Sequence, residues 1–190
     1  MELPVNVVDV REVGTTPHGE TPLHWRLLTN HPIVTARDID AILDGYAHRW
    51  KIEELHRVWK SGACRVEQSQ LRTSERVIKW AILAVVTAAR IERLRVLART
   101  APSVSATSEF TEFEIRALTL MKRKYAKRTE TIPDGTPSMG DAIRWLAELG
   151  GYAGRPSSGR PGAVTIRRGL EFITPVAIAF ELLQNEGKMR

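Results

Sequence analysis

Residues 46–60 read Tyr-Ala-His-Arg-Trp-Lys-Ile-Glu-Glu-Leu-His-Arg-Val-Trp-Lys, and their spacing predicts one helix with two different faces. When successive residues advance by about 100°, four polar side chains fall within roughly 60° of arc: Tyr46, Arg49, Glu53 and Lys60. The opposite side carries apolar residues that we expect to face a core: Ile52, Leu55, Val58 and Trp59. The helix should therefore bury one side and present a carboxylate, two cations and a phenol on the other.

Two interpretations of the polar face stay open on spacing alone. A carboxylate can hold a divalent cation while arginine and lysine grip phosphate oxygens, so the face would suit phosphate chemistry. A solvated charged face with incidental Glu–Lys and Glu–Arg pairs has the same pattern.

The segment before this helix predicts two strands. Residues 6–13 and 23–28 are short aliphatic or β-branched runs separated by glycine and proline. Thr35 with Asp38 has the spacing of a capping box, which predicts a helix running on to Lys60, with a possible kink at Gly45 and a stop at Gly62. Because two strands do not form a stable sheet alone, this region is predicted to be a piece of a larger α/β domain.

The rest of the chain is predicted to be helical. An irregular connector over 61–70 leads to a long apolar helix from Thr73 or Ser74 to about residue 98. Residues 101–108, rich in Pro, Ser and Thr, are the predicted linker, followed by a helix over 109–127. A second capping box at Ser138 opens a helix that ends at residues 150–151, and after a loop over 154–162 the last helix is bent or restarted at Pro175.

Composition indicates a globular protein with a mild basic excess. The 190 residues are 43% hydrophobic and 26% charged, and 28 Lys and Arg against 22 Asp and Glu give a net charge of +6. This charge favours polyanionic partners, nucleic acid first, although many ordinary proteins are equally basic. Cys64 is the single cysteine, so no intrachain disulfide or cysteine-rich zinc site is expected. With no secretory signal at the start and no apolar run of membrane-spanning length, we expect a cytoplasmic protein without a membrane partner.

The pattern Tyr46, Arg49, Glu53, Lys60 resembles the YREK signature of DDE transposases in the insertion-sequence-four family, of the transposon-five type. The flanks are similar too: residues 23–30 resemble the last core strand of that family, and residues 60–67 its following connector. Residues 150–151 and 161–170 resemble its helical dimerisation domain more loosely.

The resemblance implies an α+β, mostly α-helical fold. Residues 1–100 would be the C-terminal portion of an RNase H-like catalytic domain, with two short strands plus helices, and residues 109–190 a helical dimerisation domain. In that family two Asp and one Glu hold two Mg²⁺ or Mn²⁺ ions for phosphodiester cleavage and strand transfer. Glu53 matches this glutamate and would be both catalytic residue and metal ligand.

The resemblance also implies DNA-binding roles. Tyr46, Arg49 and Lys60 match phosphate-holding residues, and Trp25 matches an aromatic that stacks on a flipped-out base. Trp50 would pack or probe the same region. For both tryptophans, an ordinary core position is the alternative.

The sequence departs from the family at the two aspartates, which are expected well upstream of the residues given. Asp9 falls just before the matching strand, and we assign it no catalytic role. The end-recognition region is not found either. We therefore do not expect this chain to bind Mg²⁺ by itself, and we expect it to be inactive alone.

Two features bear on partners. The basic run over 122–128 predicts either a DNA-backbone contact or a solvated helix end. The apolar residues after Ser138 exceed what a small helical domain buries, which favours a subunit interface with itself or with full-length transposase.

Three functions follow from these observations. The first is part of a cut-and-paste transposase acting on transposon-end DNA, and the second is a non-catalytic dimerising fragment that inhibits full-length transposase. The third is a basic helical DNA-binding module.

Overall fold

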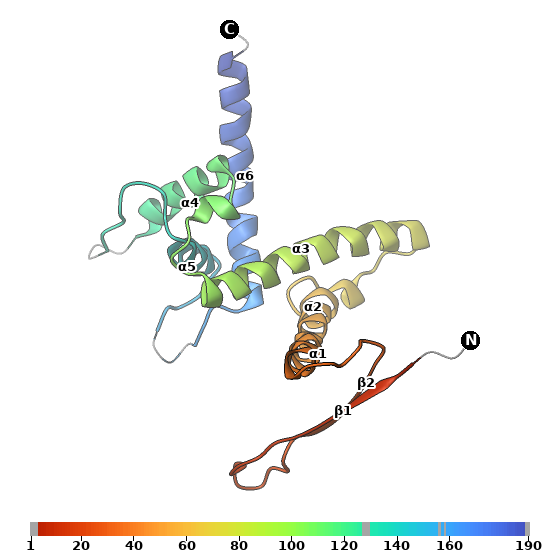
Figure 1. The fold of residues 1–190 in the computed structure, drawn as a ribbon. Coiled ribbons are helices and arrows are strands. Elements are labelled where there is room, and N and C mark those ends of the chain that lie inside the picture. The colour runs from red at the N-terminus through yellow and green to blue at the C-terminus, as the bar shows by residue number, and fades with distance from the viewer. Residues whose placement is uncertain (1–3, 127–129, 156, 158, 189–190) are drawn as a thin grey trace. The chain divides into compact units, whose positions relative to one another are not determined.

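The computed structural model describes residues 4–126, 130–155, 157 and 159–188. It is mostly helical, with one two-stranded hairpin (Figure 1). This confirms the predicted fold class. The chain divides into two compact units, residues 1–53 and 54–190, with the division inside a helix.

The first unit contains the hairpin and the helix that follows it. Strands β1 (Asn6–Arg11) and β2 (His24–Thr29) pair antiparallel, with Val8 opposite Leu27. Successive residues of a strand point to opposite faces, so the paired Val8 and Leu27 point to the same face. They are the buried hydrophobic residues of the described part of the hairpin. The two strands lie close to the ranges predicted for them, 6–13 and 23–28.

Helix α1 (Ala36–His48) begins at the predicted capping box. The Asp38 carboxylate accepts hydrogen bonds from the backbone N–H of Val34 and Thr35, which also lower the pKa of Asp38. The single helix predicted to reach Lys60 is interrupted: α1 ends at His48 and α2 (Trp50–Lys60) begins two residues later. Arg49 at this junction keeps right-handed helical dihedrals, and no break occurs at Gly45, which lies inside α1.

The second unit is a helical bundle with its own core. After the turn η1 (Val66–Gln68), its main elements are α3 (Ser74–Thr100), α4 (Glu112–Tyr125), α5 (Met139–Leu149) and α6 (Ala163–Lys188), with a short turn η2 (Ala106–Ser108) before α4. The largest fully buried side chains come from all four helices: Ile91, Leu94, Leu118, Met139, Ile143, Leu146, Ile166 and Ile173. Cys64 is buried at the edge of this core, and its burial raises the pKa of the thiol.

The segment over 101–108, where composition predicted a linker, is packed inside the second unit. The backbone carbonyl of Pro102 accepts from the N–H of Gly140, and Met139 donates to Val104. Ala106 is fully buried. The assignment of the flanking regions to a catalytic portion and a dimerisation domain stays a prediction.

Two glycines allow α5 and α6 to cross at close range. A Cβ atom on Gly150 would lie 1.8 Å from the carbonyl oxygen of Thr165, and a Cβ atom on Gly169 would lie 2.0 Å from that of Leu146. Gly151 adopts φ +94°, a left-handed conformation that ends the helix as predicted. The backbones therefore meet without intervening side chains.

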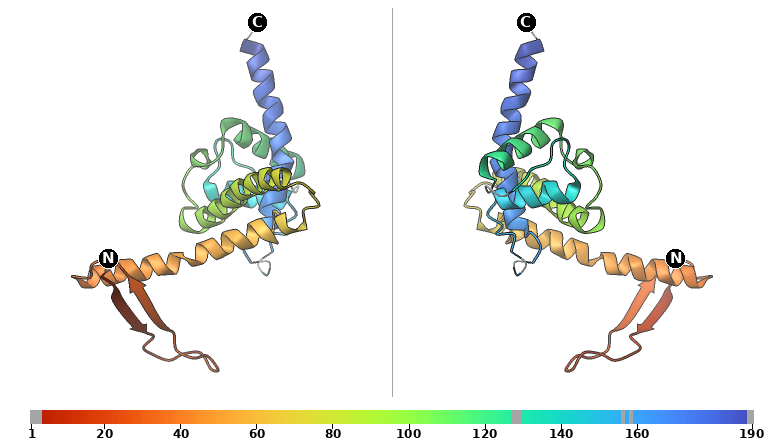
Figure 2. Two further views of the ribbon diagram at one scale, coloured as in Figure 1. Left: turned by 90° about the vertical axis from the view of Figure 1, so that its right-hand side faces the viewer. Right: turned by 90° about the vertical axis from the view of Figure 1, so that its left-hand side faces the viewer.

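Helix α6 extends past the rest of the bundle. Its C-terminal half projects beyond α4 and α5 in every view (Figures 1 and 2). The prediction of a restart at Pro175 is wrong, because α6 runs continuously through this residue. A proline removes one helical hydrogen bond, and the packing of Ile173 and Ala177 on either side holds the helix in place.

Candidate nucleic-acid interface

Three of the predicted site residues lie together at the junction of α1 and α2. The Arg49 Nη1 atom is 3.2 Å from Oε1 of Glu53, and the Arg49 guanidinium lies 5.6 Å from the ring centre of Tyr46. The helical dihedrals of Arg49 preserve this arrangement across the junction, with Arg49 donating to the carbonyl of Tyr46 and Ile52 donating to that of Arg49. The Glu53 side chain is 51% exposed, so solvent reaches it.

The hairpin brings a fourth predicted residue to this group. Trp25 on β2 packs edge-on against the ring of Tyr46, with the ring centres 4.9 Å apart. Trp25 is only partly buried. Trp50 is 65% exposed, so it does not serve as a core residue of the first unit. Ile52, predicted to face a core, is 57% exposed.

A cleft of about 600 Å³ runs beside Tyr46 between β2 and α1. Its lining includes Arg26, Thr29, His31, Asp38 and Ile42. Neither Arg26 nor His31 is among the predicted site residues, since neither belongs to a recognisable motif. On β2, Arg26 alternates with His24 on the exposed face, and this polar alternation is the signal that could have pointed to Arg26.

Asp9 takes part in an ion cluster on the hairpin. His24 and Arg26 each contact its carboxylate at 3.0 Å, and Arg11 does so at 3.3 Å. The hydrogen bond from His24, followed by that from Arg26, lowers the pKa of Asp9. Asp9 therefore has a structural role, because its carboxylate holds three basic side chains together on an exposed face of the hairpin.

Lys60 is exposed at the last residue of α2 and belongs to the second unit. Of the apolar residues predicted to face a core, Val58 is 2% exposed, and Leu55 and Trp59 pack against the second unit's core. The Trp59 indole N–H donates to the carbonyl of Ala81 on α3. The C-terminal half of α2 is thus fixed to the bundle.

The described residues do not fit a complete magnesium or manganese site. Glu53 is engaged by Arg49, and across the described part of the chain no three His, Cys, Asp or Glu residues gather as ligands. A two-metal centre needs several carboxylate ligands held close together. Glu53 would be one ligand of such a centre.

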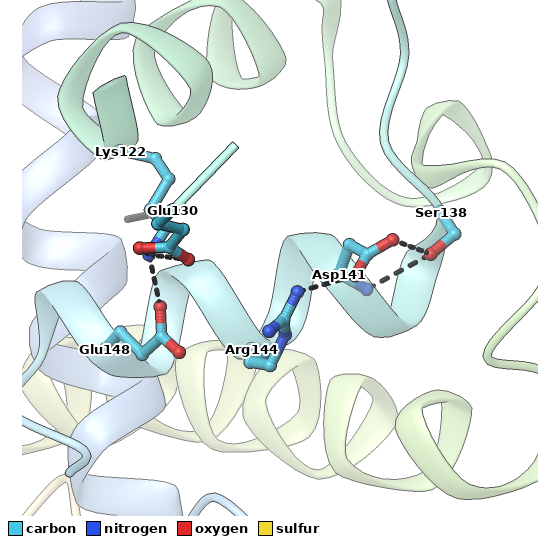
Figure 3. A network of polar contacts seen from close by, with 6 residues as sticks. All are labelled: Lys122, Glu130, Ser138, Asp141, Arg144 and Glu148. Carbon is cyan, nitrogen blue, oxygen red and sulfur yellow. Dashed lines mark hydrogen bonds and ion pairs between the residues drawn. The ribbon is translucent and has the colours of Figure 1, made fainter. Parts of the chain in front are cut away.

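The cations of the basic run differ in their surroundings, and Lys122 lies between two carboxylates (Figure 3). Lys122 is 6% exposed, and its Nζ atom lies 2.6 Å from Glu148 and 2.7 Å from Glu130. Burial acts to lower the pKa of Lys122, but the hydrogen bonds that its ammonium donates to Glu130 and Glu148 outweigh burial and raise the pKa. Lys122 therefore joins α4 to α5 and cannot contact DNA, contrary to the backbone-contact interpretation for this residue.

The other cations of the run are placed differently. Arg123 pairs with Asp134, and Lys124 lies over the ring of Tyr125 at 5.6 Å, both on the surface. Residues 127 and 128 fall outside the described residues.

Among the described helices, none combines the length and the apolar character that a membrane span requires.

In a comparison with known protein families, residues 86–181 match the dimerisation domain of Tn5 transposase. The matched residues run from the middle of α3 through α4 and α5 and into the projecting half of α6. They cover about half of the chain and most of the bundle core. The chain therefore belongs to the family of the Tn5 transposase dimerisation domain, which ties it to DNA transposition.

Proposed function

We propose that this chain is the C-terminal part of a cut-and-paste DNA transposase, carrying the glutamate of the DDE triad. The observation that carries the proposal is the grouping of Trp25, Tyr46, Arg49 and Glu53 in the first unit, in a chain whose second unit matches a transposase family. The enzyme as a whole would cleave and rejoin phosphodiesters of transposon-end DNA in the cytoplasm.

Each residue of this group has a role suited to its chemistry. The Arg49 guanidinium can grip a phosphate with two parallel hydrogen bonds once Glu53 turns to another partner. Tyr46 orients Arg49 through its ring and can donate its hydroxyl to a phosphate oxygen. Trp25, half-buried against Tyr46, presents a surface for stacking on an unpaired base. Lys60 would add a second cation and Trp50 a further aromatic contact.

Self-association would use the outer side of α6. Its buried stripe comprises Ile166, Leu170, Ile173 and Ala177. At 100° per residue, three exposed apolar residues point away from this buried stripe and form a second, exposed apolar stripe: Ile178, Leu182 and Leu183. A helix that is apolar on both sides needs a second partner, and another copy of the chain or full-length transposase would supply it.

A salt series of DNA binding tests the proposal. The chain should bind duplex DNA weakly and without sequence preference. A plot of log affinity against log salt concentration should fall with a slope of roughly one unit for each phosphate neutralised. Arg49→Ala with Lys60→Ala should flatten the slope by about two, whereas Glu53→Ala should leave it unchanged or steepen it slightly. A slope unchanged by the double replacement would show that neither Arg49 nor Lys60 contacts DNA.

An inhibitory role is the second candidate. It is favoured by the match of residues 86–181 to a dimerisation domain, which suits pairing with another transposase chain. The chain alone should then neither nick nor join DNA with Mg²⁺ or Mn²⁺, and should block an intact transposase that shares its second unit when added in excess. Metal-dependent nicking that disappears in Glu53→Ala would contradict this candidate.

A further inference from the structure

A small pocket in the second unit is lined by arginines from three different elements. It has a volume of about 280 Å³ and lies where the C-terminal end of α3 meets α5 and the segment just before α6. We call it the arginine pocket, after its four cationic residues: Arg95, Arg99, Arg144 and Arg160. Ala98, Ile143 and Ile166 give it an apolar floor.

Two of the arginines are held in place by neighbouring carboxylates. Arg95, whose side chain is 19% exposed, pairs with Glu92 at 2.5 Å, and Arg144 pairs with Asp141 at 2.8 Å (Figure 3). Asp141 is itself fixed by a hydrogen bond from the Ser138 hydroxyl. A guanidinium has five N–H donors, so each of these pairs orients an arginine and leaves donors for a ligand.

The other two arginines bring positive charge that no described carboxylate neutralises. Arg99 donates its Nε hydrogen to the backbone carbonyl of Arg95, which fixes the side chain without cancelling its charge. Arg160 is exposed, and no hydrogen bond or ion pair of its side chain is found within the described ranges. Its neighbour Gly159 accepts a hydrogen bond from the hydroxyl of Tyr152, which ties this segment to the end of α5.

We propose that the arginine pocket binds a tetrahedral phosphate group. Convergent guanidinium forks match the oxygens of phosphate, and like charges gathered around one concavity gain free energy when an anion enters. The volume of about 280 Å³ is large enough to admit a single oxyanion. The phosphate can come from the DNA backbone or from a free phosphate ion.

The decisive variant is Arg99→Gln with Arg160→Gln, which removes the two charges without carboxylate partners. Its control is Arg72→Gln with Arg76→Gln, an equal change of charge at exposed positions by the opposite end of α3. Thermal unfolding of the whole chain in sodium phosphate and in sodium chloride of equal ionic strength gives the first measurement. Phosphate should raise Tm by a few degrees in the wild type and the control, and by no more than chloride in the pocket variant.

Binding to a labelled duplex across a salt series then separates the two sources of phosphate. A log–log slope that is lower by about two in the pocket variant than in the control assigns the site to a DNA backbone phosphate. An equal slope, with the phosphate effect on Tm lost, assigns it to a free phosphate ion. No phosphate-specific rise of Tm in the wild type, or an equal rise in the pocket variant, overturns the site whatever the DNA series gives. Neither measurement involves Trp25 or Glu53, so this site can fail while the transposase proposal stands.

Discussion

Gly150 and Gly169 face each other's helices where α5 and α6 cross, and neither position has room for a side chain. Both would place a Cβ atom at 2.0 Å or less from a backbone carbonyl oxygen of the other helix. Backbone cannot yield as a flexible side chain can, so a methyl group here must separate the helices. The crossing also lies within the residues that match the dimerisation family.

We therefore expect Gly169→Ala to destabilise the second unit. Inserting a methyl group into a packed contact typically costs ~1–3 kcal/mol, and a clash with backbone belongs at the upper end. Urea unfolding followed by circular dichroism would measure the loss. Gly162→Ala is the matched control, because a Cβ atom there meets nothing within 4 Å. Equal stability of the two variants would contradict the close crossing.

Lys122→Met should also weaken the second unit. The substitution keeps an unbranched side chain as far as the ε atom but leaves the carboxylates of Glu130 and Glu148 without their shared cation. Breaking a buried ion pair from one side costs ~3–5 kcal/mol, and the lower end applies because both carboxylates are about a quarter exposed. Lys124→Met, at an exposed position two residues later, should change the free energy of unfolding by less than about 0.5 kcal/mol.

The same contact makes stability depend on pH at the alkaline end. The pKa of Lys122 is raised in the folded chain, so its contribution is complete below the ordinary lysine value of 10.5. It is lost as pH rises through the folded pKa. The difference in unfolding free energy between wild type and Lys122→Met should therefore shrink above pH 10.5. A difference that stays constant to higher pH would contradict the raised pKa.

Leu182→Asp should reduce self-association of the chain. It places a charge in the middle of the exposed apolar stripe on α6, where burial in an interface would strip the carboxylate of water. Asn185→Asp adds the same charge to the same helix at an exposed polar position. Sedimentation velocity over a range of concentrations should show a monomer for the first variant and unchanged association for the second. If both associate like the wild type, another surface forms the dimer.

Trp25→Ala should selectively weaken binding to DNA that carries an unpaired base. Stacking of a base on an aromatic side chain is worth ~1–3 kcal/mol, so affinity for a duplex with one bulged base should fall by roughly 5- to 150-fold. Affinity for a fully paired duplex should change little. Trp80→Ala, on α3 in the other unit, provides a comparison for the loss of an indole. A similar loss for both duplexes would mean that Trp25 acts through the shape of the hairpin.

The features that sequence predicted correctly are those encoded over a few residues. The capping box predicted at Thr35 forms, and at the one predicted at Ser138 the hydroxyl caps α5 by accepting from the N–H of Asp141, without a reciprocal bond from the Ser138 backbone among the described residues. Gly151 follows α5 in the left-handed conformation. The two strands lie near their predicted ranges for the same reason. Another capping box, between Thr111 and Glu114, was missed although its spacing is the same.

Features that depend on distant parts of the chain could not be predicted. Lys122 is one of several lysines and arginines in a basic run, and its burial is decided by Glu148, 26 residues further along. The break at Arg49 changes neither the composition nor the spacing of the helix, so periodicity gives no sign of it. The arginines of the arginine pocket lie up to 65 positions apart in the sequence, from Arg95 to Arg160.

The burial of Cys64 has a practical consequence for studying assembly. A thiol reacts as the thiolate, and this one is 5% exposed with its pKa raised by burial. Maleimide and methanethiosulfonate reagents should therefore modify it slowly in the folded chain. One new cysteine on the projecting half of α6 could then carry a spin label or a fluorophore selectively, with the natural cysteine left in place. Distances between labels would report how two copies are arranged.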